Sequence, residues 1–375
     1  MKDSTLGKIL FIMPEIAIGG AEVNVLNVVN SLENKFEEIE ILYFRNSDSD
    51  FKNKFSEKIK FTGLDNKGAK FLYKTYRDYF SEIKAAYVVT SSFIHLLHLI
   101  VLKRLGKLAS KIIYKVETNI KADLKASGTL IDRVLFYIFG NFCIKNSDLV
   151  ITSSLKLKEI LSNRYSGSQI THIYNPVVSE EDFLIESSVS HPFFNQDKNR
   201  QTLISIGRLT RSKGFEELIE VLSRINRLGS HEYNFYLIII GDGQLHHALD
   251  KLIEKLNLQN IVDIIPFNNR FLEYIKASDI FISNSFYEGL NNNLIHALSQ
   301  NIKIISTDCP FGPSEVLKNG ELGRLVKVGD QKELIEAIIE TAGEEPEFNL
   351  NRKLRAQDFL IKRNVSEFLN LIRQL

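Results

Sequence analysis

The chain has 375 residues, which is enough for two domains with large apolar cores. Its 44% hydrophobic and 25% charged residues exclude a disordered chain, and 47 cations against 46 anions exclude a globally basic nucleic-acid binder. The two cysteines, Cys143 and Cys309, can supply neither a disulfide framework nor a thiolate cluster for zinc, so we expect a reducing compartment, the cytoplasm.

We expect none of the apolar runs to cross a membrane. The run Ile9–Met13 is broken by Pro14, and the run Phe93–Leu102 is interrupted by two histidines. Both are far shorter than the roughly 20 residues of a spanning helix. The first run therefore predicts a buried strand and not a signal peptide.

Short apolar runs without polar alternation recur along the chain, separated by helical patterns. Such runs are typical of parallel strands that helices cover on both faces, so the sequence predicts an α/β fold. In chain order, the expected strands are 8–13, 38–44, 86–89, 111–116, 149–152, 203–207, 235–241, 262–266, 280–283 and 302–306.

The pattern is interrupted after Val177, where the polar stretch 178–200 has neither a strand nor a helix period. We therefore predict two Rossmann-like domains whose sheets face each other across a ligand-binding cleft. The predicted parts are an N-terminal domain 1–177, a linker 178–200, a C-terminal domain 201–355 and a C-terminal helix 356–375 that packs back on the N-terminal domain.

Two turns at strand ends have the composition of anion sites. In the first, Gly207 ends a strand and Arg208 and Lys213 precede a helix, which is the chemistry of a diphosphate clamp. In the second, Gly19 and Gly20 open the first helix. A solvated basic turn and a tight loop remain the alternatives.

The segment 285–297 carries a carboxylate, an amide and an imidazole where a strand leads into a helix. Glu288 lies on the loop, Asn292 in the first helical turn and His296 one turn further on the same face. Such a row suits the recognition of hydroxyl groups, and a capped helix with an exposed histidine is the alternative.

These motifs together resemble glycosyltransferase family 4, whose members are retaining, sugar-nucleotide-dependent enzymes of the GT-B fold. The resemblance covers most of the chain and is most specific in the C-terminal half. The matching segments are Gly19 to Glu22, Arg208 with Lys213, Gly241 to Gly243, Ala277 to Asp279, Glu288 with Gly289, Thr307 to Glu315, Gly320 to Val326 and Val328 to Asp330.

The resemblance implies a role for each matched residue. Arg208 and Lys213 would hold the donor diphosphate and act as electrophilic catalysts in place of a metal, and Glu288 would contact the hydroxyls of the donor sugar. The backbone after Glu288 would close over the sugar, and Phe267 would lie against the base. The implied donor-binding residues are Gly19, Gly20, Gly207, Arg208, Lys213, Gly241, Phe267, Glu288, Gly289, Leu290, Asn291, Asn292 and His296.

The chain departs from the family pattern at two positions. His296 stands where the family has a second glutamate for the ribose hydroxyls, which predicts weaker or more pH-sensitive donor binding. Where many members have a histidine that touches the sugar, the chain has Glu117, followed by Thr118 and Asn119. Glu117 is therefore a fourth candidate catalytic residue, and an ordinary surface acid is the alternative.

Three further patterns are weighed against simpler interpretations. Asp48 and Asp50 match a metal-binding D-x-D but lack its flanking strand, and His95 with His98 lacks a third metal ligand, so we expect neither to bind metal. The basic, apolar segment 93–115 fits either an anionic membrane or a helix that covers the N-terminal sheet.

We therefore predict a retaining glycosyltransferase that needs no metal. It would move a hexose or N-acetylhexosamine from a UDP-sugar to a glycan or undecaprenyl-linked acceptor, for capsule, O-antigen or lipopolysaccharide synthesis. The expected place is the cytoplasm, with peripheral contact to the inner face of the plasma membrane left open, and no nucleic acid is expected as a partner. The alternatives are a non-catalytic GT-B subunit that binds a glycan or a partner transferase, and a phosphorylase or epimerase of the same fold.

Overall fold

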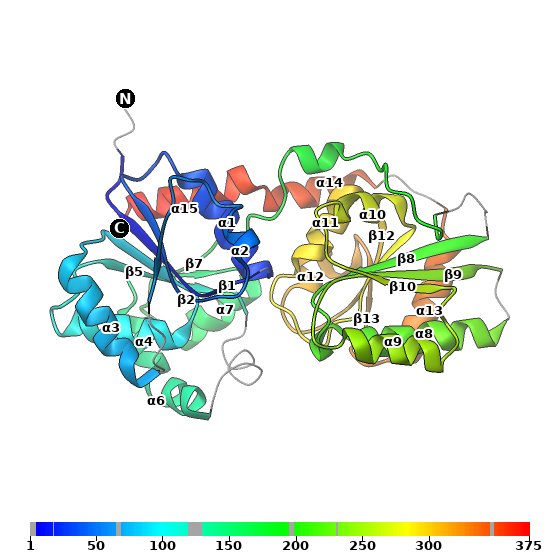
Figure 1. Cartoon of the computed structure of the whole chain (residues 1–375), viewed down its shortest axis with the longest axis horizontal. Helices are drawn as coiled ribbons and strands as arrows, with labels where there is room; N and C mark the ends of the chain where they lie inside the picture. Colours follow the sequence, from blue (N-terminus) through cyan, green and yellow to red (C-terminus); the bar gives the residue numbers. More distant parts are fainter. Residues whose placement is uncertain are drawn as a thin grey trace. The chain divides into compact units, whose positions relative to one another are not determined.

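The computed structural model describes residues 5–17, 19–64, 69–118, 130–194, 199–229, 232–345 and 349–375. The chain divides into two compact units: Met1–Pro176 with Ile361–Leu375, and Val177–Leu360. Each unit is a parallel sheet covered by helices (Figure 1). The predicted α/β class with two Rossmann-like domains is confirmed.

The first unit contains a seven-stranded sheet in the order β3-β2-β1-β4-β5-β6-β7. Its strands are β1 Ile9–Ile16, β2 Ile39–Asn46, β3 Lys60–Gly63, β4 Tyr87–Thr90, β5 Lys111–Val116, β6 Leu149–Thr152 and β7 Ile170–His172. Its helices are α1 Gly20–Leu32, α2 Ser49–Lys52, α3 Ala69–Glu82, α4 Phe93–Arg104, α6 Leu130–Asn146, α7 Leu155–Arg164 and α15 Ile361–Arg373.

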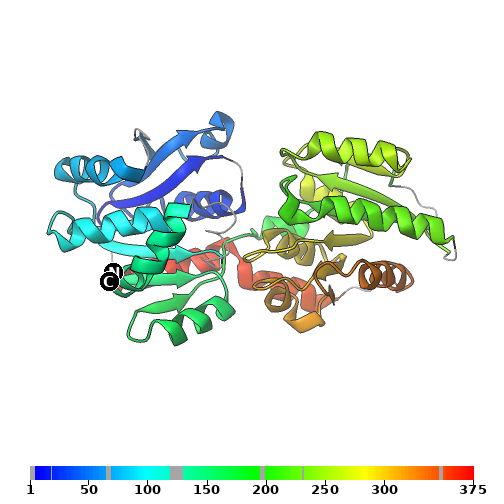
Figure 2. The same ribbon diagram turned by 90° about the horizontal axis from the view of Figure 1, so that it is seen from below.

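Helices bury both faces of this first sheet. Val29 of α1 and Phe368 of α15 belong to the core on one face, and Leu99 of α4 and Phe136 of α6 belong to the core on the other. Figure 2, which looks from below, has α4 and α6 in front of the strands. Because both faces are buried, the strands are continuous apolar runs, as Ile9–Met13 illustrates.

The second unit contains a six-stranded sheet in the order β10-β9-β8-β11-β12-β13. Its strands are β8 Arg200–Ile206, β9 Asn234–Ile240, β10 Val262–Ile265, β11 Ile280–Ser283, β12 Lys303–Thr307 and β13 Arg324–Val326. Its α-helices are α8 Phe215–Leu228, α9 His246–Lys255, α10 Phe271–Ala277, α11 Asn292–Gln300, α12 Pro313–Val316, α13 Gln331–Ala342 and α14 Leu350–Ala356, and its short 3-10 helices are η1 Glu181–Leu184, η2 Arg211–Lys213, η3 Lys318–Gly320 and η4 Gln357–Phe359.

The segment 178–200 was expected to be a linker, but its described residues are instead a packed part of the second unit. Val178 pairs with Leu360, and Gln300 Nε2 donates to the Asp182 carbonyl at 2.7 Å. Phe193 is buried. The sequence of this stretch has no periodic pattern because its backbone is mostly irregular, although it packs on the second unit.

The C-terminal part was expected to leave the second domain at residue 356, but it does so after Leu360. Helix α14 and the turn η4 belong to the second unit, where Phe359 is fully buried. Only α15 packs with the first unit, where the rings of Phe368 and Phe11 lie 6.5 Å apart.

The basic segment 93–115 covers the first sheet. The apolar side chains of α4 and the following turn, including Leu96, Ile100 and Leu108, are buried in the core. Lys103 is paired with Asp148, so part of the basic charge is neutralised inside the unit. The apolar side of this helix therefore covers the sheet, as the second of the two interpretations expected, and does not face a membrane. Among the described helices, none combines the length and apolar character that a membrane span requires.

Candidate functional site

The candidate donor site lies in the second unit, at the carboxyl ends of β8 and β11. These neighbouring strands are joined by a crossover, because β9 and β10 extend the sheet on one side and β12 and β13 on the other. Ligands of open α/β sheets bind at such a switch point. The segment starting at Gly207 and the loop with Glu288 follow these two strands.

The central contact is an ion pair between Lys213 Nζ and Glu288 Oε1. The same oxygen accepts hydrogen bonds from Ser285 Oγ at 2.6 Å and from Asn291 Nδ2 at 3.4 Å. The two charged side chains are only 19% and 13% exposed, so little solvent competes for them. The carboxylate is therefore held in a fixed position.

Two hydrogen bonds hold the basic loop against the loop after β11. Phe286 N donates to Ser212 O, and Asn284 Nδ2 donates to Gly214 O, each at 2.8 Å. Arg208 lies at the start of the same loop with an exposed side chain. The structure thus puts the second predicted cation on the same loop as Lys213, with a guanidinium that a ligand can reach.

Gly241 has a packing role that its motif did not reveal. A Cβ atom at this position would lie 1.9 Å from the carbonyl oxygen of Gly207. Only glycine therefore lets the end of β9 approach the start of the basic loop. Its contact with a donor stays a prediction.

Part of the segment after Glu288 serves the scaffold. Asn291 is 4% exposed, its Oδ1 accepts from Asn293 N at 3.1 Å, and its Nδ2 donates to Ser283 Oγ at 2.9 Å. It is the N-cap of α11, and Leu290 before it is buried. Because both side chains are buried, only the backbone groups of Leu290 and Asn291 can make the predicted contacts with a donor. Gly289 and Asn292 are partly exposed.

Aromatic packing joins the two residues predicted to contact the nucleoside. Phe267 lies beside Phe271 with ring centroids 5.6 Å apart, and Phe271 meets His296 edge-on at 5.0 Å. The N–H of Phe267 donates to Asp242 Oδ2 at 3.1 Å, which fixes the loop after β10. The sequence analysis did not identify Phe271, which carries no motif signal.

His296 is more buried than the predicted pH-sensitive role requires. Its Nδ1 is buried, with no hydrogen-bond partner in the described ranges. Burial lowers the pKa of His296 to about 4, against a smaller opposing effect of Asp182. A ring with this pKa is neutral from pH 6 to 8, which argues against the predicted change in donor affinity across that range, whereas the contact of His296 with the ribose stays a prediction.

We expect His296 to make folding pH-dependent instead. Because the pKa of about 4 in the folded chain lies below the value in the unfolded chain, the unfolded chain protonates His296 at a higher pH than the folded chain does. The contribution of the neutral His296 to the free energy of unfolding is complete above about pH 6.5 and is lost as the pH falls towards 4. Urea unfolding at pH 7 and pH 5 should show a larger loss of stability for wild type than for His296→Gln. Equal losses would contradict the buried, neutral imidazole.

The patterns weighed as metal sites have structural partners. Asp48 Oδ1 accepts from Phe51 N at 2.9 Å and so caps α2. His95 Nδ1 shares a 2.7 Å hydrogen bond with Tyr76, and burial lowers the pKa of His95 to about 3. His98 Nδ1 lies 2.7 Å from the Ile94 carbonyl. These contacts agree with the simpler interpretations.

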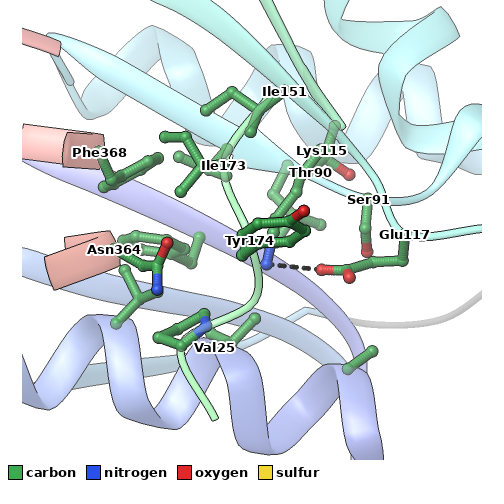
Figure 3. Close-up of a pocket in the computed structure, with 16 residues that line it drawn as sticks. Val25, Thr90, Ser91, Lys115, Glu117, Ile151, Ile173, Tyr174, Asn364 and Phe368 are labelled. Atoms are coloured by element: carbon green, nitrogen blue, oxygen red, sulfur yellow. Dashed lines mark ion pairs between the residues drawn. The ribbon is translucent and has the colours of Figure 1, made fainter. Parts of the chain in front are cut away.

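A second candidate site is a pocket in the first unit, shown in Figure 3. Most of its wall is apolar, and its charged part is an ion pair of 2.6 Å between Lys115 Nζ and Glu117 Oε1. The side chain of Glu117 is 16% exposed, so it is not an ordinary surface acid. The lining residues are Phe11, Ile12, Ala21, Val25, Val28, Val89, Thr90, Ser91, Lys115, Glu117, Ile151, Ile173, Tyr174, Pro176, Asn364 and Phe368.

The pocket also brings the first glycine turn to Glu117. Helix α1 begins at Gly20 after an extended Gly19, and Ala21 next to them lines the pocket. These residues line one pocket because β1, which precedes the glycine turn, and β5, which precedes Glu117, lie on either side of β4 in the sheet. Sequence reasoning missed Lys115 as a partner, although its spacing of two residues puts it on the same side of the extended chain as Glu117.

Comparison with known proteins identifies the second unit. Residues 188–357 match the family described as Glycosyl transferases group 1. An uncharacterized glycosyltransferase of Methanocaldococcus jannaschii is 33% identical over 216 residues, which are 55% of this chain and 52% of the relative. The chain thus spans about half the length of this relative.

Two other matches extend over the whole chain. A Campylobacter jejuni alpha-1,4-N-acetyl-D-galactosaminyltransferase, whose name gives a PP-undecaprenol-linked saccharide, is 24% identical over 98% of this chain and 99% of its own. The crystal structure of Anabaena HepE with UDP and glucose has a TM-score of 0.77 at 17% identity, covering 98% of this chain and 100% of that one. The chain therefore has the two-domain GT-B fold, and most of its second unit matches the model of the glycosyl transferases group 1 family.

Proposed function

We propose that the protein is a retaining glycosyltransferase that transfers a hexose or N-acetylhexosamine from a UDP-sugar to a glycan or undecaprenyl-linked acceptor of a bacterial cell-surface polysaccharide. The observation that carries the proposal is the pairing of Lys213 with Glu288 beside the exposed Arg208. A non-catalytic scaffold would have no use for a carboxylate fixed by a cation at the switch point of its sheet.

The donor binds in the second unit. Arg208 and Lys213 take the diphosphate, and the N-terminus of α11 adds a positive dipole. Glu288 accepts hydrogen bonds from hydroxyls of the sugar, and Phe267 lies against the uracil. UDP as the nucleotide is supported by its presence in the Anabaena HepE structure of the same fold.

The reaction needs charge stabilisation at the leaving group. The bond between the anomeric carbon and the diphosphate oxygen breaks, the acceptor oxygen forms the new bond on the same face, and its proton passes to the departing phosphate. Negative charge grows on the diphosphate during this step, and the cations Arg208 and Lys213 stabilise it. No protein nucleophile is required.

The acceptor binds in the first unit, in the pocket of Figure 3. Glu117 accepts a hydrogen bond from an acceptor hydroxyl, and the ion pair with Lys115 holds this carboxylate in place. A lipid-linked saccharide as the acceptor is supported by the name of the Campylobacter jejuni relative. The test of the whole proposal is a panel of nucleotide sugars followed by calorimetry and by nucleoside diphosphate release, with glycan and undecaprenyl-linked acceptors supplied.

We expect a UDP-sugar to bind and react without added divalent metal. Arg208, Lys213 and the helix N-terminus already supply the positive potential that a metal provides elsewhere. UDP release in the presence of a chelator should nearly equal release in its absence. Complete loss of turnover in the chelator, restored by Mg²⁺ or Mn²⁺, would contradict the clamp assignment.

A further inference from the structure

Helix α6 of the first unit exposes an apolar face. Opposite this face, Phe136 and Cys143 are buried in the core. No other described helix carries more than two exposed large apolar side chains. On α6 they range from 40% to 90% exposed, and they are Leu130, Ile131, Val134, Tyr137, Ile138, Phe139 and Phe142.

The exposed side chains form a continuous strip. Leu130, Val134, Ile138 and Phe142 are each four residues apart, which places them in one row along the helix surface. Figures 1 and 2 both show α6 on the outside of the first unit, beyond α4. Contiguous apolar surface of this kind on a soluble unit marks an interaction site.

Cations border this strip. The Arg104 guanidinium lies 5.8 Å from the centroid of the Phe142 ring, and Lys107 on the following turn is exposed. Lys145 at the end of α6 is exposed as well. Of the nearby acids, Asp148 is paired with Lys103, and Asp132 in the first turn of α6 lies outside the row.

We infer that α6 docks on the surface of an anionic lipid bilayer, with its axis in the plane of the interface. An exposed helix with apolar and aromatic side chains on its outer face and cations beside them has the chemistry of an interfacial helix. The 17 residues of α6 fit this geometry and are fewer than the roughly 20 that a spanning helix needs.

A second copy of the chain fits this surface less well. In a symmetric dimer the same face meets itself, so the second copy brings the same cations and no complementary negative surface. A membrane instead offers negative charge to all of them. The inference rests on the proposed function only for the purpose of the docking, which is to bring the enzyme to a lipid-linked acceptor.

The test is flotation of the full chain with two kinds of vesicle, phosphatidylcholine alone and phosphatidylcholine mixed with phosphatidylglycerol. We expect binding to the mixed vesicles, weakened at least about tenfold by the pair Ile138→Glu and Phe142→Glu and similarly by Arg104→Glu with Lys107→Glu. The matched control is the pair Leu184→Glu and Leu228→Glu, at exposed positions of the second unit, which should bind like wild type.

Three outcomes would overturn the inference: wild type that binds neither vesicle, α6 variants that bind as well as wild type, or a wild-type dimer in analytical ultracentrifugation that the α6 substitutions dissociate. Each variant is also checked by circular dichroism and by calorimetry with UDP, because a variant that keeps its fold and UDP binding isolates the docking surface. Wild type that binds mixed vesicles but turns over no nucleotide sugar would contradict the proposed function and leave the docking surface intact.

Discussion

Replacing Arg208 or Lys213 with alanine is expected to lower the turnover rate by about a hundredfold or more. Each substitution removes a positive charge from the place where the diphosphate gains negative charge as the glycosidic bond breaks. Glu288→Gln should have a similar effect, because it removes the charge that Lys213 pairs with and an acceptor for sugar hydroxyls. Steady-state release of nucleoside diphosphate measures the effect.

Arg211→Ala is the matched control, since Arg211 is an exposed cation on the same loop. It should keep a rate close to that of wild type, and all four variants should retain the circular dichroism of the folded protein. If Arg208→Ala, Lys213→Ala and Glu288→Gln all turned over a verified donor at wild-type rates, the active site would have to lie elsewhere.

The sequence predicts the buried strands well and the edge strands poorly. All ten apolar runs named in the sequence analysis are strands, because a strand buried on both faces must be apolar throughout. The three strands that it missed are β3, β7 and β13, which lie at or near sheet edges and are three or four residues long. Most of their side chains are partly exposed, so no apolar run marks them.

The domain boundary shows what composition cannot distinguish. A polar stretch without periodicity, such as 178–200, has the same sequence pattern whether it is a linker or irregular backbone that covers a core. Its attachment comes from single contacts over long sequence distances, for example Gln300 with the Asp182 carbonyl. Such contacts leave no periodic pattern in the sequence.

At the candidate donor site the sequence predicts which residues take part, but not how they interact. The motifs gave Lys213 and Glu288 separate roles, and only the structure joins them in an ion pair across 75 positions. The motifs also placed His296 at the ribose, whereas its burial, which sets its pKa, depends on the fold around it. Charge state is a property of the packed site, so residue type alone cannot supply it.

The second large effect is expected from Gly214→Ala, at the junction of the basic loop and α8. Gly214 has a φ of +64°, in the left-handed region, and an added Cβ would lie 2.2 Å from the Asn284 carbonyl oxygen. The methyl group therefore pushes the basic loop away from the loop after β11. Lys213, the preceding residue, moves with it and loses its fixed place beside Glu288.

Gly229→Ala separates this displacement from simple backbone strain. Gly229 follows the other end of α8 with a φ of +57°, and an added Cβ there meets nothing within 4 Å. We expect this control to lose on the order of 1 kcal/mol of stability, the cost of the left-handed conformation, with unchanged turnover. Gly214→Ala should lose about 1 to 3 kcal/mol more, because the methyl group also clashes with packed backbone.

Turnover decides between the two explanations of any loss of activity in Gly214→Ala. Measured at a temperature where urea unfolding shows both variants to be folded, its rate should fall at least about tenfold while Gly229→Ala matches wild type. Binding of nucleoside diphosphate should weaken in parallel, since the misplaced loop carries part of the clamp. Equal stability and equal rates for the two alanine variants would mean that the basic loop tolerates the shift, and that the contact between Gly214 and Asn284 does not position Lys213 for the reaction.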